Sequence, residues 1–93
     1  MIKVCKFGGT SMADANAIRQ VKSIISADES RRYIVVSAPG KRFKDDIKIT
    51  DMLYRANSEV LECGTCKKSF KLIRDRFTEI VKDLGLTLDI ESI

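Results

Sequence analysis

IKVCKFGGTS, from Ile2 to Ser11, is an apolar run that closes on paired glycines. Its β-forming residues predict a strand over residues 2–7, followed by a turn at Gly8 and Gly9 and then a helix. A glycine turn lets backbone N–H groups approach a ligand closely, and a helix start adds unpaired donors and a partial positive charge. With the ammonium group of Lys6 beside the turn, the stretch predicts an anion site suited to a polyphosphate.

A purely structural interpretation of the same stretch is also open, because strand ends with tight glycine turns are common. The spacing matches neither the Walker A motif nor the G-x-G-x-x-G fingerprint of dinucleotide-binding proteins. Gly40-Lys41 resembles the end of a Walker A motif, but Val35 stands where the first glycine of that motif would lie. The pattern alone therefore leaves both interpretations open.

The next segments alternate between helix-type and strand-type patterns. Ser11 and Asp14 form a capping-box pattern that predicts a helix over about residues 13–27. The β-branched run that follows predicts a second strand over residues 33–38. A strand, a helix and a strand of these lengths predict a βαβ unit with parallel strands and a right-handed crossover.

The second half of the chain reads as helical. Apolar spacing predicts helices over about residues 50–62 and 67–84, with Gly85 as the cap of the latter and a tail at 86–93 that is a linker or a short strand. Parallel sheets are usually covered on both faces and have more than two strands. The chain is therefore expected to be the front part of a larger α/β domain.

Composition narrows the function classes. The 93 residues carry a net charge of +4, but their Lys and Arg residues are spread out and not interleaved with aromatics, which disfavours nucleic-acid binding. Apolar runs fall short of the roughly 18–20 residues that span a membrane, and a signal peptide is not evident, so no membrane partner and a cytoplasmic location are expected. The sequence has no His, which excludes histidine acid–base catalysis within it.

Two hydroxyl side chains form a second candidate site. Ser37 follows the predicted second strand, at the carboxyl end where open α/β sheets bind their ligands. Thr50 lies at the start of a predicted helix, where hydroxyl and backbone donors hold a carboxylate. The structural alternative is that Ser37 only ends a strand and Thr50 only caps a helix.

The cysteine pair and the acidic side chains predict no metal centre. Cys63 and Cys66 lie between two helices and lack further Cys or His ligands nearby, so they are interpreted as reduced thiols. Asp45, Asp46 and Asp51 are potential magnesium ligands, but a solvated loop explains the first two more simply.

Three stretches taken together resemble the aspartokinases of the amino-acid kinase family: 6–11, 35–41 and 48–53. The resemblance spans about residues 2–60, and Met12 departs from it by replacing a smaller branched residue. It implies a three-layer αβα sandwich with a mainly parallel sheet. Residues 1–93 would form the N-terminal part of the catalytic domain, without its remainder and without the regulatory ACT domains.

The resemblance implies ATP-dependent phosphorylation of the side-chain carboxylate of L-aspartate, the first step towards lysine, threonine and methionine. ATP and Mg²⁺ are expected for the intact enzyme. In the nucleotide site, Lys6 would be catalytic by neutralising phosphate charge. Gly8 and Gly9 would contact phosphate through N–H groups, and Ser11 would lie at the nucleotide end.

The resemblance also assigns Ser37 and Thr50 to binding of the L-aspartate substrate. Two alternatives stay open: a small interaction module whose glycine turn is structural, or an amino-acid kinase that acts on glutamate or carbamate. The chain alone is expected to lack kinase activity. Open sheet edges and apolar faces predict association into a homo-oligomer.

Overall fold

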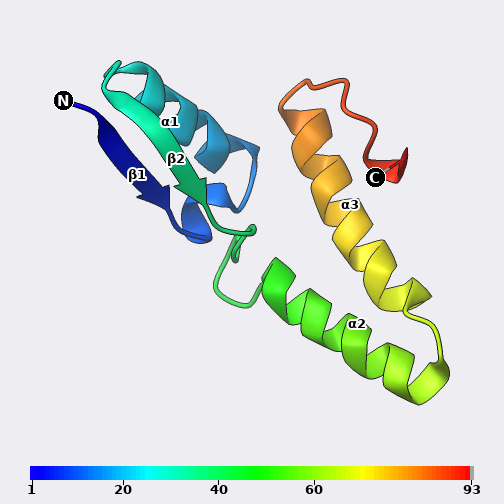
Figure 1. Cartoon of the computed structure of the whole chain (residues 1–93). Coiled ribbons are helices and arrows are strands. Elements are labelled where there is room, and N and C mark those ends of the chain that lie inside the picture. The colour runs from blue at the N-terminus through cyan, green and yellow to red at the C-terminus, as the bar shows by residue number, and fades with distance from the viewer. Residues whose placement is uncertain (93) are drawn as a thin grey trace. The chain divides into compact units, whose positions relative to one another are not determined.

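The computed structural model describes residues 1–92, which divide into two compact units at residues 48 and 49. Within these residues, the first unit contains two strands and one α-helix, and the second contains two α-helices (Figure 1). None of these helices combines the length and the apolar character that a bilayer span requires.

The first unit is a βαβ unit. Strand β1 (Lys3–Phe7) pairs in parallel with β2 (Arg31–Val36), with Phe7 opposite Val36. Helix α1 (Ala15–Ser26) leads from the carboxyl end of β1 back to the start of β2 (Figure 1). The predicted parallel pair and its α/β class are confirmed, and the carboxyl ends of both strands lie at one edge of the sheet.

The start of α1 differs from the prediction. The helix begins at Ala15, and its N-cap is Asp14, whose carboxylate accepts a 2.9 Å hydrogen bond from the N–H of Ala17. Ser11 instead lies inside a short 3-10 turn, η1 (Thr10–Met12). An N-cap residue needs an extended backbone, which Asp14 has, with φ −150° and ψ 179°. The predicted capping role of Ser11 is therefore wrong.

Strand β2 also starts earlier than predicted, at Arg31, and ends at Val36 before Ser37. A turn on Asp28 produces this early start, because the Asp28 carbonyl accepts the N–H of Arg31 at 3.1 Å. The Asp28 carboxylate also binds the Lys3 ammonium at 2.7 Å, and this bond lowers the pKa of Asp28 well below its usual range. These contacts fix the entry of both strands into the sheet.

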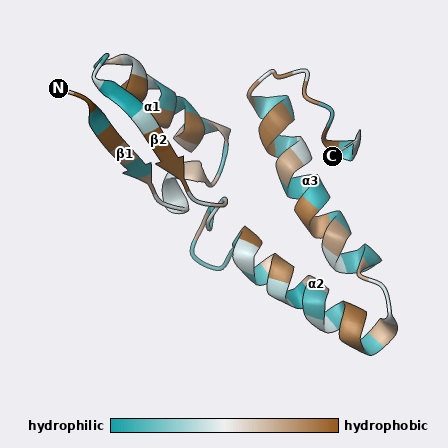
Figure 2. Ribbon diagram, viewed as in Figure 1, coloured by the Kyte–Doolittle hydropathy of each residue, from teal (hydrophilic) through white to brown (hydrophobic). Residues whose placement is uncertain are grey.

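One face of the sheet is apolar and open. Neighbouring residues in a parallel register share a face, so Val4 lies with Tyr33, and Lys6 lies with Val35. Of the uncharged residues on this face, Val4 is 71% exposed, Tyr33 is 61% exposed and Val35 is 51% exposed. Figure 2 shows the hydrophobic run of β2. Strands of this composition are typical of a larger sheet that is covered on both faces.

The second unit is a helical hairpin of α2 (Ile49–Cys63) and α3 (Lys67–Asp83), each within one residue of its predicted bounds. Gly64 ends α2 with φ +77°, and Gly85 follows α3 with φ +71°. After α3, the N–H groups of Gly85 and Leu86 bond back to the carbonyls of Lys82 and Val81, both at 3.0 Å. This is the Schellman pattern, and it confirms the predicted cap.

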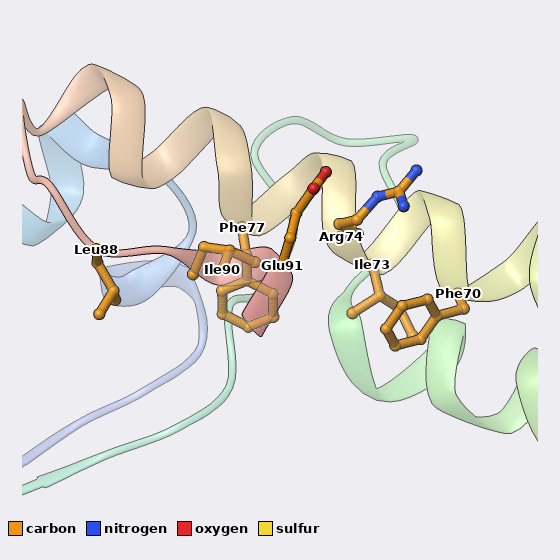
Figure 3. Close-up of a pocket in the computed structure, with 7 residues that line it drawn as sticks. All are labelled: Phe70, Ile73, Arg74, Phe77, Leu88, Ile90 and Glu91. Atoms are coloured by element: carbon orange, nitrogen blue, oxygen red, sulfur yellow. The ribbon is translucent and has the colours of Figure 1, made fainter. Parts of the chain in front are cut away.

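The tail after Gly85 forms a short 3-10 turn, η2 (Ile90–Ser92), so the short-strand alternative for the tail is wrong. Ile93, the last residue of that predicted segment, lies outside the described residues. The tail and α3 enclose a cavity of about 540 Å³ (Figure 3). Its apolar lining comprises Phe70, Ile73, Phe77, Leu88 and Ile90.

A single carboxylate caps the start of α3. Glu59, on α2, accepts the N–H of Lys68 at 3.1 Å and the N–H of Ser69 at 3.0 Å, and it also accepts the Ser69 hydroxyl. The Ser69 hydroxyl bond lowers the pKa of Glu59 below its ordinary 4.5. Two N–H groups that the first turn of a helix leaves without partners are thereby bonded across the hairpin.

We expect Glu59→Ala to lower the thermal unfolding midpoint of the chain by several degrees, as measured by circular dichroism. The variant leaves the N–H groups of Lys68 and Ser69 without their carboxylate acceptor. Because the pKa of Glu59 is lowered in the folded state, its contribution is present above pH 4.5 and is lost as pH falls through the folded-state pKa.

Glu62→Ala is the matched control on the same helix, since the Glu62 side chain is exposed and has no hydrogen bond or ion pair among residues 1–92. Equal midpoints for the two variants at neutral pH would contradict the capping role of Glu59.

The open sheet face predicts self-association of the chain, because exposed apolar strands pair with other surfaces. Light scattering at rising concentration should show a dimer or a larger species. Val4→Glu should reduce this association, whereas Leu61→Glu, 79% exposed on α2 and outside the sheet, should not. A monomer at high concentration would contradict the prediction.

Candidate functional site

The paired glycines follow β1 directly and begin a tight turn. The carbonyl of Gly8 accepts the N–H of Ser11 at 3.1 Å, and the carbonyl of Gly9 accepts the N–H of Met12 at 3.1 Å. Gly9 has helical backbone angles, φ −60° and ψ −39°. The turn therefore directs the chain from the strand into η1 without a left-handed residue.

Three successive N–H groups in this turn are available to a ligand. Among residues 1–92, no protein acceptor bonds the N–H of Gly8, Gly9 or Thr10. Consecutive backbone donors in a turn attract anions, and phosphate is a common occupant of such turns. The predicted phosphate contacts of Gly8 and Gly9 fit this geometry. The backbone N–H of Ser11 is already bonded, so Ser11 has only its hydroxyl to offer.

Lys6 adds a positive charge near these donors. It lies on the exposed face of β1, two residues before Gly8. Within the described part of the chain, its ammonium group has no carboxylate or other hydrogen-bond partner, in contrast to Lys3, which binds Asp28 at 2.7 Å. The charge of Lys6 is thus not neutralised by the protein.

The segment after β2 lies directly against the glycine turn. The N–H of Ser37 bonds to the carbonyl of Phe7 at 3.0 Å, and the N–H of Gly40 bonds to the carbonyl of Gly9 at 2.8 Å. A Cβ atom added to Gly40 would lie 2.7 Å from the carbonyl carbon of Gly9, which no real contact permits. The structure therefore brings stretches 6–11 and 35–41 together, through glycines that are distant in sequence.

The predicted hydroxyl pair falls in two different units. Ser37 is half-buried at the carboxyl end of β2, as predicted. Thr50 is exposed in the first turn of α2, in the second unit. A shared binding role for these two hydroxyls stays a prediction.

One of the acidic loop residues, Asp46, has a structural role. Asp46 accepts bonds from the Nε of Arg42 at 2.7 Å and from its backbone N–H at 2.9 Å. The side-chain bond from Arg42 lowers the pKa of Asp46 well below its usual range.

Over residues 1–92, no three His, Cys, Asp or Glu side chains gather into a metal-binding group. Cys63 and Cys66 are free thiols, as predicted.

Sequence reasoning missed two features of the site. The free N–H of Thr10 depends on the 3-10 turn, whereas the sequence pattern predicts a helix cap at the next residue, Ser11. The role of Gly40 depends on its contact with Gly9, which no local pattern indicates. Gly40 belongs to stretch 35–41 of the family resemblance, but as a glycine after Pro39 it is equally typical of a simple strand stop.

Comparison with known proteins gives consistent matches. A sequence model of the amino acid kinase family matches residues 1–87. The chain is similar to Aspartokinase 3 of Bacillus subtilis, with 35% identity over 85 residues, which cover 91% of this chain and 19% of that protein. It is also similar to the aspartokinase of Chlamydia muridarum, with 34% identity over 90 residues, 95% of this chain and 18% of that protein.

A solved structure matches as well. The crystal structure of the aspartate kinase of Clostridium acetobutylicum, described as an allosteric enzyme, is 49% identical and superposes with a TM-score of 0.89. The match covers 96% of this chain and 21% of the crystallised one. The chain thus spans about a fifth of the length of the curated relatives that it matches.

Gly40→Ala should destabilise the chain by about 1–3 kcal/mol in urea unfolding, because the new methyl group must displace the Gly9 carbonyl. Gly8→Ala is the matched comparison, since a Cβ atom there meets nothing within 4 Å. We expect the Gly8 variant to change stability by about 0.5 kcal/mol at most. Equal losses in the two variants would refute the close approach of Gly40 to Gly9.

Proposed function

The chain belongs to the amino acid kinase family, and from this premise we propose that it forms the nucleotide-phosphate side of an aspartokinase active site. The reaction would transfer the terminal phosphoryl group of ATP to the side-chain carboxylate of L-aspartate. Its product, 4-phospho-L-aspartate, is the first intermediate towards lysine, threonine and methionine. In this proposal residues 1–93 form the N-terminal part of the catalytic domain.

The observation that carries the proposal is the set of free N–H groups at Gly8, Gly9 and Thr10, together with the unpaired ammonium of Lys6 on the strand that leads into this turn. Phosphoryl transfer places negative charge on the oxygens of the moving group, and enzymes accelerate it mainly by positioning and by electrostatic stabilisation. The N–H groups would hold phosphate oxygens in a fixed direction. Lys6 would neutralise charge that develops during transfer.

The acceptor side requires less from the protein. A carboxylate is already a nucleophile, so the reaction needs no strong base, and the lack of His in the sequence is compatible with it. We assign Ser37 and Thr50 to hydrogen bonding of L-aspartate, in accordance with their positions at a strand end and in a first helical turn. The relatives compared above are aspartokinases, which favours aspartate over glutamate or carbamate as acceptor.

Magnesium would accompany the nucleotide, where it supplies charge neutralisation between phosphate oxygens. The described carboxylates offer no ready-made site for the ion, since Asp46 is bonded to Arg42.

The proposal places the reaction in the cytoplasm, where ATP is available and thiols such as Cys5 stay reduced. It also includes a homo-oligomeric enzyme.

A chimera tests the proposed function. Residues 1–90 of this chain should replace the matching segment of the Clostridium acetobutylicum aspartate kinase, and ADP formation should be measured with ATP and L-aspartate. We expect the chimera to be active. Lys6→Ala in the chimera should lower kcat/KM by about 10²–10³-fold, as for loss of other groups that stabilise transition-state charge.

Lys3→Ala is the control on the same strand, because it removes a lysine that pairs with Asp28 at the opposite end of β1. We expect its kcat/KM to stay within about twofold of the parent chimera, since exposed ion pairs contribute little. An active chimera in which Lys6→Ala turns over normally would remove the assigned role of Lys6. A folded but inactive chimera would contradict the proposed function.

A further inference from the structure

Two hydrogen bonds connect the loop after β2 to the loop after β1. The N–H of Ser37 donates to the carbonyl of Phe7, and the N–H of Gly40 donates to the carbonyl of Gly9. Each bond fixes the direction of one carbonyl, and hence of one rigid peptide plane. The two planes concerned are those that join Phe7 to Gly8 and Gly9 to Thr10.

A peptide plane that is held by its carbonyl also aims its N–H. All described peptide bonds are trans, so the N–H of each plane points opposite to the carbonyl of the same plane. The carbonyl of Phe7 points towards the second loop, where its donor Ser37 lies, and the carbonyl of Gly9 accepts there from Gly40. The Gly9 carbonyl also accepts the N–H of Met12 within its own turn, but at the longer distance of 3.1 Å. The N–H groups of Gly8 and Thr10 therefore point away from that loop, and both belong to the free donors of the candidate phosphate site.

We propose that Gly40 is a positioning residue, which aims the N–H of Thr10 at a nucleotide phosphate by holding the Gly9 carbonyl. The inference rests on the proposed nucleotide site and adds a role that acts through the neighbouring peptide. A side chain at position 40 would lie against the plane itself, with its Cβ 2.7 Å from the Gly9 carbonyl carbon and 2.9 Å from the Thr10 nitrogen. Only glycine permits this contact without displacing that plane.

The same contact couples the two halves of the site. Ser37, assigned to the acceptor, and Gly40 belong to one short segment, and that segment fixes the donors assigned to the nucleotide.

Nuclear magnetic resonance of the isotope-labelled chain tests the inference during titration with ATP. The amide protons of Gly8 and Thr10 should move downfield along one binding curve as they bond to phosphate. The Gly40 amide should exchange more slowly with solvent water, because its bond to Gly9 becomes more persistent. Adenosine, which lacks the phosphates, should produce none of these changes.

The Gly40→Ala variant distinguishes a specific role of Gly40 in aiming the Thr10 N–H from a general loss of structure. The dispersion of the variant's amide spectrum shows whether the variant is folded. In the folded variant the Thr10 shift should be lost while the Gly8 shift remains, since Ser37 still holds the Phe7 carbonyl. The ATP affinity should fall about tenfold, as expected for one lost charge-assisted hydrogen bond. Parallel loss of the Gly8 and Thr10 shifts in a folded variant would overturn the positioning role.

If the Gly40→Ala variant fails to fold, the ATP titration of the unmodified chain still tests the inference. Shifts at Gly8 and Thr10 with slower Gly40 exchange support the inference. A Gly8 shift without a Thr10 shift, or with unchanged Gly40 exchange, overturns the positioning role and leaves the nucleotide site in place. If ATP shifts none of these amides, the proposed nucleotide site and the inference that rests on it both fail.

Discussion

The close approach of Gly40 to Gly9 is the constraint on which the site depends. The N–H of Gly40 bonds to the carbonyl of Gly9 at 2.8 Å, and the remaining space between them excludes any side chain. Parallel pairing of β1 and β2 brings their carboxyl ends to one edge of the sheet, so the two loops meet there. The strand register thereby determines where the backbone donors of the glycine turn lie.

The electrostatic character of the site follows from what the protein leaves unpaired. The carbonyls of the glycine turn are bonded, whereas its N–H groups at Gly8, Gly9 and Thr10 are not. The ammonium of Lys6 faces solvent, while the other lysine of β1 is paired with Asp28. A surface that presents donors and positive charge together favours an anion, and the similarity to aspartokinases makes ATP the proposed one.

Sequence patterns predicted most of the elements, because apolar periodicity and glycine caps are local signals. The βαβ unit, the bounds of α2 and α3 and the cap at Gly85 were available in this way. The start of α1 was not, since both Ser11 and Asp14 are good caps and only the 3-10 turn decides between them. The contact of Gly40 with Gly9 is tertiary, so a pattern in either segment alone cannot reveal it.

The most direct measurement is a crystal structure of a kinase that contains this sequence, with ADP bound. We expect phosphate oxygens within about 3 Å of the backbone nitrogens of Gly8 and Thr10 and of the ammonium of Lys6. The Gly40 N–H should still donate to the Gly9 carbonyl in that complex. Phosphates bound away from this turn, with its N–H groups facing solvent, would show that the glycine turn is not the nucleotide site.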